Sequence, residues 1–210
     1  MTLDYAAARE NMVENQVRTN DVTDHAVQDA IRAVARERLC PPTRQHLAYA
    51  ETEVEYAPGY FLMQPRCIAK LLQGVRPRAG ERALAIGAPY AAMVMKRIGL
   101  AVRLRMAPGV EAPSCVAEAG VEVVPAELGA IDDSAPFDVL VAEGSVHHVP
   151  ETWTGMIGEG GRLGVVEREG PVGRARLYLR GSDGLVAGRT LFDASPHYLS
   201  GFSPQPAFQF

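Results

Sequence analysis

The pattern of apolar and polar residues divides the chain into two parts at about residue 80. In the first part, apolar residues return at helical spacing and predict three helices, over residues 4–18, from Asp24 onward and from Pro65 to Gly74. Asp4 is a suitable N-cap for the first helix. Residues 45–58 predict a loop that becomes extended around 53–56. The first part is therefore expected to be mainly helical.

After residue 80, short apolar runs alternate with segments that suit helices. The runs lie at residues 82–86, 102–106, 121–124, 137–142 and 163–166. This alternation is typical of parallel strands joined by crossover helices. Residues 174–179 and 185–192 flank a Gly-Ser-Asp-Gly turn, which predicts an antiparallel hairpin at the sheet edge. Prolines from Pro196 onward predict a loosely structured C-terminal tail.

Composition narrows the class of protein. The 210 residues are 47% hydrophobic and 22% charged, with a formal net charge of -4, which argues against a nucleic-acid partner. The sequence has no apolar run long enough for a membrane span, and its N-terminal stretch lacks the apolar core of a signal peptide, so we expect a cytoplasmic protein. Cys40, Cys67 and Cys115 fit no metal-binding spacing and are expected to be reduced and mostly buried.

The stretch ERALAIGAPY, residues 81–90, is the candidate ligand loop. An apolar strand breaks at Gly87, and a helix-compatible segment starts at Ala91. Strand, glycine turn and helix in this order begin a Rossmann-type domain, where the turn receives a nucleotide-like ligand. Such a loop normally carries several glycines, whereas this one has Gly87 alone, followed by Pro89.

Several stretches together resemble the protein-L-isoaspartate O-methyltransferase family. They are MVENQVR with VTD, AIRAVARERLCP, AYAE, GERALAIGAPY, FDVLVAEGSVHHVPE, EGGRLGVV and GPVGRARLYLR, in the family's order over about residues 11–192. The resemblance implies a Rossmann-like class I methyltransferase fold of the α/β class, with a mostly parallel sheet and a C-terminal hairpin. It implies a helical N-terminal cap over residues 1–80 packed as one unit with a methyltransferase-type domain over 81–210. It also implies S-adenosylmethionine as cofactor and a protein or peptide as methyl acceptor.

The candidate cofactor loop departs from the family's pattern, which resembles LEIGTGSGY. LAIGAPY keeps Gly87 and Tyr90, but it is shorter and has Ala85 in place of the acid. Pro89 lacks an N–H donor and places its ring in space that a ligand would use. We expect Pro89 and Tyr90 to fill part of the cofactor cleft. Gly87 is then either a cofactor contact or simply the turn from strand to helix, and we favour the turn.

The ribose and adenine positions are also altered. In VRLRMAPG no acid ends the second strand, where a carboxylate would bind the ribose hydroxyls. Arg103 and Arg105 stand there instead and are expected to lie on a solvated edge. Glu127 falls near the position from which the family contacts adenine, and Glu143 could line a pocket at the same sheet edge. An acid after a third strand is often an ordinary surface residue, and we favour that interpretation for Glu127.

The acceptor position has lost its hydroxyl. Where the family has a stretch resembling TISQP, this chain has FLMQP, so that Met63 replaces the Ser or Thr that helps to bind the isoaspartyl carboxylate. A thioether is a poor partner for a carboxylate. Methyl transfer depends mainly on orientation of the nucleophile, so this change weakens the case for catalysis. We assign no catalytic residue.

Other polar candidates are few. His147 and His148 are adjacent, so their side chains are expected to diverge, and we predict loop histidines and no metal site. Ser145 has no evident base beside it and is not predicted to be a nucleophile. Trp153 is expected to pack its helix onto the sheet.

Two functions remain open. In the first, which we favour, the chain has weak or lost cofactor binding and acts as a binding or scaffold protein. In the second, it is an active S-adenosylmethionine-dependent protein carboxyl methyltransferase with a shortened loop or another acceptor. The sequence does not define its partner or its oligomeric state.

Overall fold

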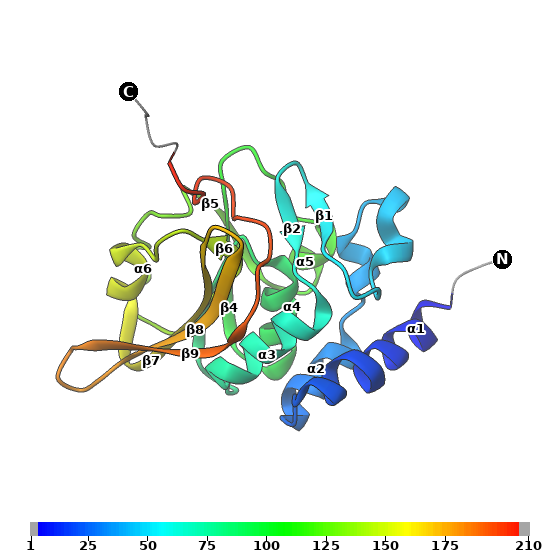
Figure 1. Cartoon of the computed structure of the whole chain (residues 1–210), viewed down its shortest axis with the longest axis horizontal. Helices are drawn as coiled ribbons and strands as arrows, with labels where there is room; N and C mark the ends of the chain where they lie inside the picture. The colour runs from blue at the N-terminus through cyan, green and yellow to red at the C-terminus, as the bar shows by residue number, and fades with distance from the viewer. Residues whose placement is uncertain (1–3, 206–210) are drawn as a thin grey trace.

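A seven-stranded sheet in the order β5-β4-β3-β6-β7-β8-β9 forms the centre of the computed structural model, which describes residues 4–205 (Figure 1). The parallel strands are β3 (Arg82–Ile86), β4 (Ala101–Met106), β5 (Glu122–Pro125), β6 (Phe137–Val146) and β7 (Ile157–Glu169). The strands β8 (Val172–Arg180) and β9 (Val186–Asp193) add an antiparallel hairpin at one edge. The predicted parallel strands and the edge hairpin are confirmed.

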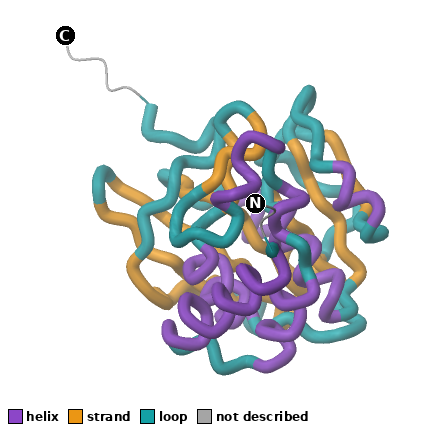
Figure 2. Tube along the Cα trace, turned by 90° about the vertical axis from the view of Figure 1, so that its right-hand side faces the viewer, coloured by secondary structure: helices purple, strands orange, loops and turns teal. Residues whose placement is uncertain are grey.

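The N-terminal part is mainly helical, as predicted. The helices are α1 (Tyr5–Met12), continued by a π-helical turn at Val13–Val17 and a 3-10 turn at Arg18–Asn20, then α2 (His25–Ala33) and α3 (Pro65–Val75). Asp4 and Asp24 each accept a hydrogen bond from the backbone N–H three residues further on, so both act as N-caps. Figure 2 views the molecule from the side on which α1 and α2 lie, and these helices stand in front of the strands.

The segment between α2 and α3 is more regular than the sequence predicts. It forms 3-10 helices at Arg36–Leu39 and Pro42–Leu47, followed by an antiparallel pair of strands, β1 (Val54–Ala57) and β2 (Tyr60–Leu62). The extended region around 53–56 is confirmed, whereas β2 was not expected. With only three residues, β2 gives almost no alternation by which to recognise it.

The remaining helices are α4 (Pro89–Ile98), α5 (Ser114–Glu118) and α6 (Glu151–Gly155). Helix α4 begins two residues before the predicted start at Ala91. Pro89 occupies its first position, where a proline loses no helical hydrogen bond and its fixed φ suits the helix.

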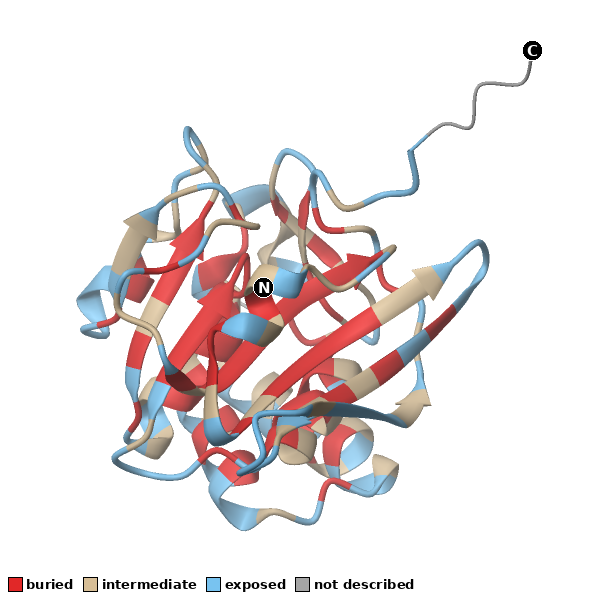
Figure 3. Cartoon of the chain, turned by 90° about the vertical axis from the view of Figure 1, so that its left-hand side faces the viewer, coloured by how far each residue is buried: buried red, intermediate tan, exposed pale blue. Residues whose placement is uncertain are grey.

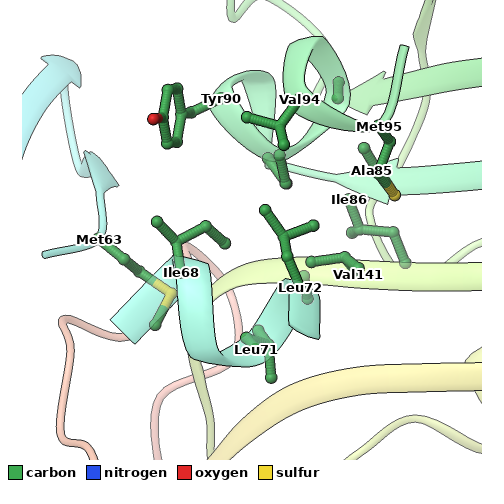
Figure 4. Packing of buried hydrophobic residues seen from close by; sticks show 14 of the residues in the cluster. Met63, Ile68, Leu71, Leu72, Ala85, Ile86, Tyr90, Val94, Met95 and Val141 are labelled. Carbon is green, nitrogen blue, oxygen red and sulfur yellow. The ribbon is translucent and has the colours of Figure 1, made fainter. Parts of the chain in front are cut away.

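The hydrophobic core lies between the sheet and the helices. Figure 3 shows that the central strands are buried, whereas the loops and the hairpin tip are exposed. Figure 4 shows Ile68 and Leu72 of α3 on the side of Val94 of α4, whereas Met95 of α4 lies beside Ala85 of β3. Over residues 4–205, no helix combines the length and apolarity needed to cross a membrane. The three cysteines are free, with Cys40 and Cys115 buried and Cys67 half-buried, which confirms the prediction for them.

Candidate functional site

The candidate site lies at the carboxyl edge of the sheet, where β3, β4 and β6 end. Gly87 follows β3 with φ +56°, a conformation that side chains disfavour, and its N–H donates to the Arg105 carbonyl oxygen at 2.9 Å. Its own carbonyl oxygen accepts a hydrogen bond from Tyr56 Oη at 3.2 Å. Gly87 therefore turns β3 into α4, and both of its backbone polar groups already have partners within the chain.

Tyr90 is buried in the core rather than lining an open cleft. Its side chain is 1% exposed, and Pro89 beside it is also buried, as predicted. The Arg36 guanidinium lies over the Tyr90 ring, 4.5 Å from its centroid, and donates to the carbonyl oxygens of Ala48 and Met63. Burial raises the pKa of Tyr90 to about 12. The N-terminal part thus closes directly over the start of α4.

Glu143 of β6 is a buried carboxyl group at the same place. Its Oε1 accepts a hydrogen bond from the Met63 N–H at 3.0 Å. Its Oε2 has no hydrogen-bond partner among residues 4–205, although the amides of Ala91 and Tyr90 lie close enough to affect the carboxyl group. Burial raises the pKa of Glu143 to about 7, and nearby Arg36 and these amides limit the rise. Glu143 therefore joins β6 to the backbone of Met63, and its carboxyl group is closed off from solvent.

We expect the Glu143→Gln variant to change how stability depends on pH. Between pH 4.5 and pH 7, the folded chain keeps a proton on Glu143 that the unfolded chain has lost. Stability should therefore fall as the pH rises through this window, by an amount on the order of 2 kcal/mol. Urea unfolding at pH 5 and pH 8 should show a smaller fall for the Gln variant. The exposed Glu127→Gln variant is the control, and parallel profiles for Glu143→Gln and the native chain would contradict the assignment.

The next-to-last residue of β4, Arg105, is a buried cation in the stretch where the sequence lacks the expected acid. Arg105 is 1% exposed and its Nη2 lies 3.1 Å from Asp132 Oδ2, while Nη1 donates to the Ala130 carbonyl oxygen. Asp132 also pairs with Arg103 at 2.7 Å. Although burial opposes it, these cations and the Ser134 N–H lower the pKa of Asp132. The expected solvated edge is wrong for Arg105, because Asp132 compensates its charge in the interior, and Arg103 is half-buried.

Residues 194–202, here called the C-terminal segment, cover this edge and are not the loosely structured tail that the prolines predict. Main-chain hydrogen bonds join the segment to β6: Ser145 N–H to His197 O at 2.8 Å, Leu199 N–H to Ser145 O at 2.8 Å, and His147 N–H to Phe202 O at 2.8 Å. Ser145 Oγ donates to the Pro196 carbonyl oxygen at 2.6 Å. The segment lies parallel to β6 like a short additional strand. The part of the predicted tail from residue 206 onward lies outside the described residues.

Leu199 anchors the segment against the two glycines of the edge. Its side chain is 3% exposed, and a Cβ placed on Gly87 would lie 2.7 Å from Leu199 Cδ1. A Cβ on Gly144, whose φ is +135°, would lie 3.3 Å from the Leu199 backbone nitrogen. Leu199 therefore occupies the space beside Gly87 and Gly144 that a side chain at either position would need.

A second anchor lies beyond the first. The Phe202 ring packs on Trp153, with 5.1 Å between ring centroids. Trp153 is fully buried and its indole N–H donates to the Leu128 carbonyl oxygen at 2.8 Å. Trp153 thus packs α6 as predicted, and it also supports the segment.

The region expected to bind the methyl acceptor also meets the C-terminal segment. Met63 is fully buried, so its thioether does not face an acceptor. The His197 ring stacks on Phe61 with centroids 4.0 Å apart, and its Nδ1 lies 2.7 Å from Glu53 Oε2. A cleft of about 370 Å³ remains, lined by Glu53, Gln64, Arg66, Cys67 and residues 193–196.

The other predicted residues are not brought into one site. Glu127 is exposed in the loop after β5, whereas Gly87, Tyr90 and Glu143 are buried together. The His147 and His148 rings do not diverge as expected, because their centroids are 3.9 Å apart. No group of metal-binding side chains occurs within residues 4–205. Sequence reasoning missed Leu199, Arg36 and Asp132. The apolar spacing of Leu199 and Phe202 was a usable signal, whereas nothing in the sequence marked Arg36 or Asp132 as buried.

Comparisons with known proteins agree with this architecture. The family model described as Protein-L-isoaspartate(D-aspartate) O-methyltransferase (PCMT) matches residues 7–190. The chain is 32% identical over 191 residues to the Protein-L-isoaspartate O-methyltransferase of Methylorubrum extorquens, which covers 86% of this chain and 83% of that protein. It is 32% identical over 170 residues to Protein-L-isoaspartate O-methyltransferase 1 of Rhodopseudomonas palustris. This match covers 76% of this chain and 69% of that protein.

Solved structures share the fold at low sequence identity. One is the Plasmodium falciparum chain described as a beta-aspartate methyltransferase in complex with S-adenosyl-L-homocysteine. It has a TM-score of 0.75 and 16% identity, and the superposition covers 95% of this chain and 99% of that one. The family model and the relatives identify the family, and this chain belongs to the protein-L-isoaspartate O-methyltransferases.

Proposed function

We propose that this chain keeps the family's fold, does not bind S-adenosylmethionine or transfer its methyl group, and serves as a binding or scaffold protein for a protein or peptide partner in the cytoplasm. The observation that carries the proposal is the position of Leu199, whose side chain packs against Gly87 and Gly144. A cofactor approaching either backbone would have to displace it. The three free thiols suit a reducing compartment.

Two further features support the loss of the cofactor site. At the carboxyl end of β4 no acid is present to accept hydrogen bonds from ribose hydroxyls, and the last residue of the strand is Met106. At the end of β3, both backbone polar groups of Gly87 are engaged by Arg105 and Tyr56. The residues present therefore do not fit an adenosyl cofactor, and we derive no catalytic step through one.

The second candidate function is the methyl transfer that the relatives' names describe. The observation in its favour is the family match, which spans residues 7–190 and ends before the C-terminal segment. In this alternative the segment leaves the edge and a cofactor enters. On leaving, the C-terminal segment would lose its main-chain hydrogen bonds to Ser145 and His147, and Leu199 would become exposed.

A methyl-transfer assay separates the two functions. With radiolabelled S-adenosylmethionine and an isoaspartyl peptide, we expect no incorporation above a reaction without enzyme. The Methylorubrum extorquens relative, assayed in parallel, controls for the substrate and the conditions. Incorporation that rises in proportion to the concentration of this chain would establish the alternative.

A further inference from the structure

An open, positively charged groove lies at the end of the sheet opposite the candidate site. It has a volume of about 750 Å³ and runs between α3, the connection from α3 to β3, and the edge strand β9. These three elements contribute apolar and basic side chains, chiefly Lys70, Gln73, Arg76, Arg78, Arg189 and Leu191, and the turn before α2 adds Asp21, Thr23 and Asp24. Since Arg76 and Arg78 precede β3 whereas Gly87 follows it, the groove is separate from the covered carboxyl edge.

The basic residues of this groove lack acidic partners. Within residues 4–205, no carboxylate oxygen lies within 4.0 Å of a side-chain nitrogen of the four basic residues, Lys70, Arg76, Arg78 and Arg189. The neighbouring Glu81 carboxylate is already bound by Arg162, at 2.8 and 2.9 Å. Two acids also line the groove, exposed Asp21 and Asp24, which is the N-cap of α2, so the four basic residues exceed the acids by two charges. In a chain of net charge -4, this local excess of positive charge favours an anionic ligand.

The edge strand β9 lines one side of the groove. Among residues 4–205, β9 pairs with β8 and with no second strand, so its other edge offers backbone N–H and carbonyl groups without strand partners. Its middle residues, 187–190, are exposed. Half-buried Leu191 and Phe192 lie next to the charged residues and offer apolar contact. An extended polypeptide complements such an edge by strand addition, which a nucleic acid or a free phosphate cannot do.

We propose that an extended acidic segment of a partner protein docks in this groove, pairing its backbone with the free edge of β9 and placing its carboxylates at Arg76, Arg78 and Arg189. Lys70 lies 5.0 Å from the Phe192 ring centroid and is held at the wall of the groove as a fourth contact. The inference names the partner class for the proposed binding role. It does not depend on whether the carboxyl edge binds a cofactor.

The test measures fluorescence anisotropy of a labelled peptide of alternating Glu and Val residues. The native chain should bind it saturably, and the double variant Arg78→Glu/Arg189→Glu should bind at least about tenfold more weakly. The matched control is Arg97→Glu/Arg174→Glu, which makes the same charge change at exposed positions outside the groove and should stay within about twofold of the native chain. Circular dichroism of each variant checks that the fold is intact.

A second probe tests strand addition. The same peptide with N-methyl groups on alternate backbone nitrogens keeps its carboxylates but cannot pair fully with β9, so its affinity should fall by at least about tenfold. The proposal is overturned by no saturable binding of the first peptide, by equal binding to the Arg78→Glu/Arg189→Glu variant, by equal binding of the N-methylated peptide, or by tighter binding of a single-stranded RNA. None of these outcomes changes the methyl-transfer assay, so failure here and failure of the proposed function are distinguishable.

Discussion

Replacing Leu199 by Ala should lower the free energy of unfolding by about 3 kcal/mol. Leu199 is 3% exposed and packs between Gly87 and Gly144, so the truncation leaves a cavity that neither glycine can fill. Urea denaturation followed by circular dichroism gives the change directly. Limited proteolysis should in addition show faster cleavage within residues 194–202, because the segment loses its main apolar anchor.

Leu185→Ala is the matched control for this experiment. Leu185 is 70% exposed near the tip of the β8–β9 hairpin, so the same chemical change there should alter stability by less than about 0.5 kcal/mol. Equal effects of the two substitutions would mean that the C-terminal segment does not pack on the carboxyl edge in solution. The proposed loss of the cofactor site would then lose its main support.

Asp132→Ala should be at least as destabilising, by about 3 to 5 kcal/mol. The substitution leaves the Arg105 guanidinium buried without a compensating charge, and it also removes the acceptor for the Ser134 N–H. Thermal or urea unfolding at neutral pH measures the loss.

Two further variants show whether the uncompensated charge of Arg105 causes the loss of stability in Asp132→Ala. Arg105→Met/Asp132→Leu removes both charges and should be markedly less destabilised than Asp132→Ala, because no lone charge remains inside. Glu122→Ala removes the exposed partner of Arg103 and should change stability by less than about 1 kcal/mol. If the double variant is no more stable than Asp132→Ala, the buried pair is not what determines the loss.

Most of the fold could be predicted from the sequence because its signals are local. Each parallel strand is a short apolar run, the Gly-Ser-Asp-Gly turn specifies the β8–β9 hairpin, and Asp4 and Asp24 mark helix starts. The sequence signals were weakest for β2, which has only three residues, and for the segment after β9. The prolines of that segment suggest an irregular tail, although its backbone is ordered by hydrogen bonds. Prolines remove N–H donors, but the main-chain bonds of this segment use the Leu199 N–H and the carbonyl oxygens of His197 and Phe202.

The site was harder to predict because it depends on contacts between distant residues. The missing acid after β4 was visible in the sequence, but the burial of Arg105 depends on Asp132, which lies 27 residues away. Likewise, Glu143 reaches Met63 across 80 residues, and Arg36 stacks on Tyr90. The burial of Pro89 and Tyr90 could be anticipated because both belong to the shortened loop, whereas their filling of part of a cofactor cleft stays a prediction. The apolar residues Leu199 and Phe202 were a signal for an ordered segment, but the sequence alone does not show that Leu199 packs against the distant Gly87 and Gly144.

The central claim is that the carboxyl edge is filled by the chain itself and leaves no place for an adenosyl ligand. Isothermal titration calorimetry with S-adenosyl-L-homocysteine tests it most directly, because binding is measured without any acceptor substrate. With the Methylorubrum extorquens relative as control for ligand and buffer, the native chain should give only heats of dilution, with no saturation at ligand concentrations up to about 1 mM. Saturable binding of S-adenosyl-L-homocysteine by the native chain would contradict the account.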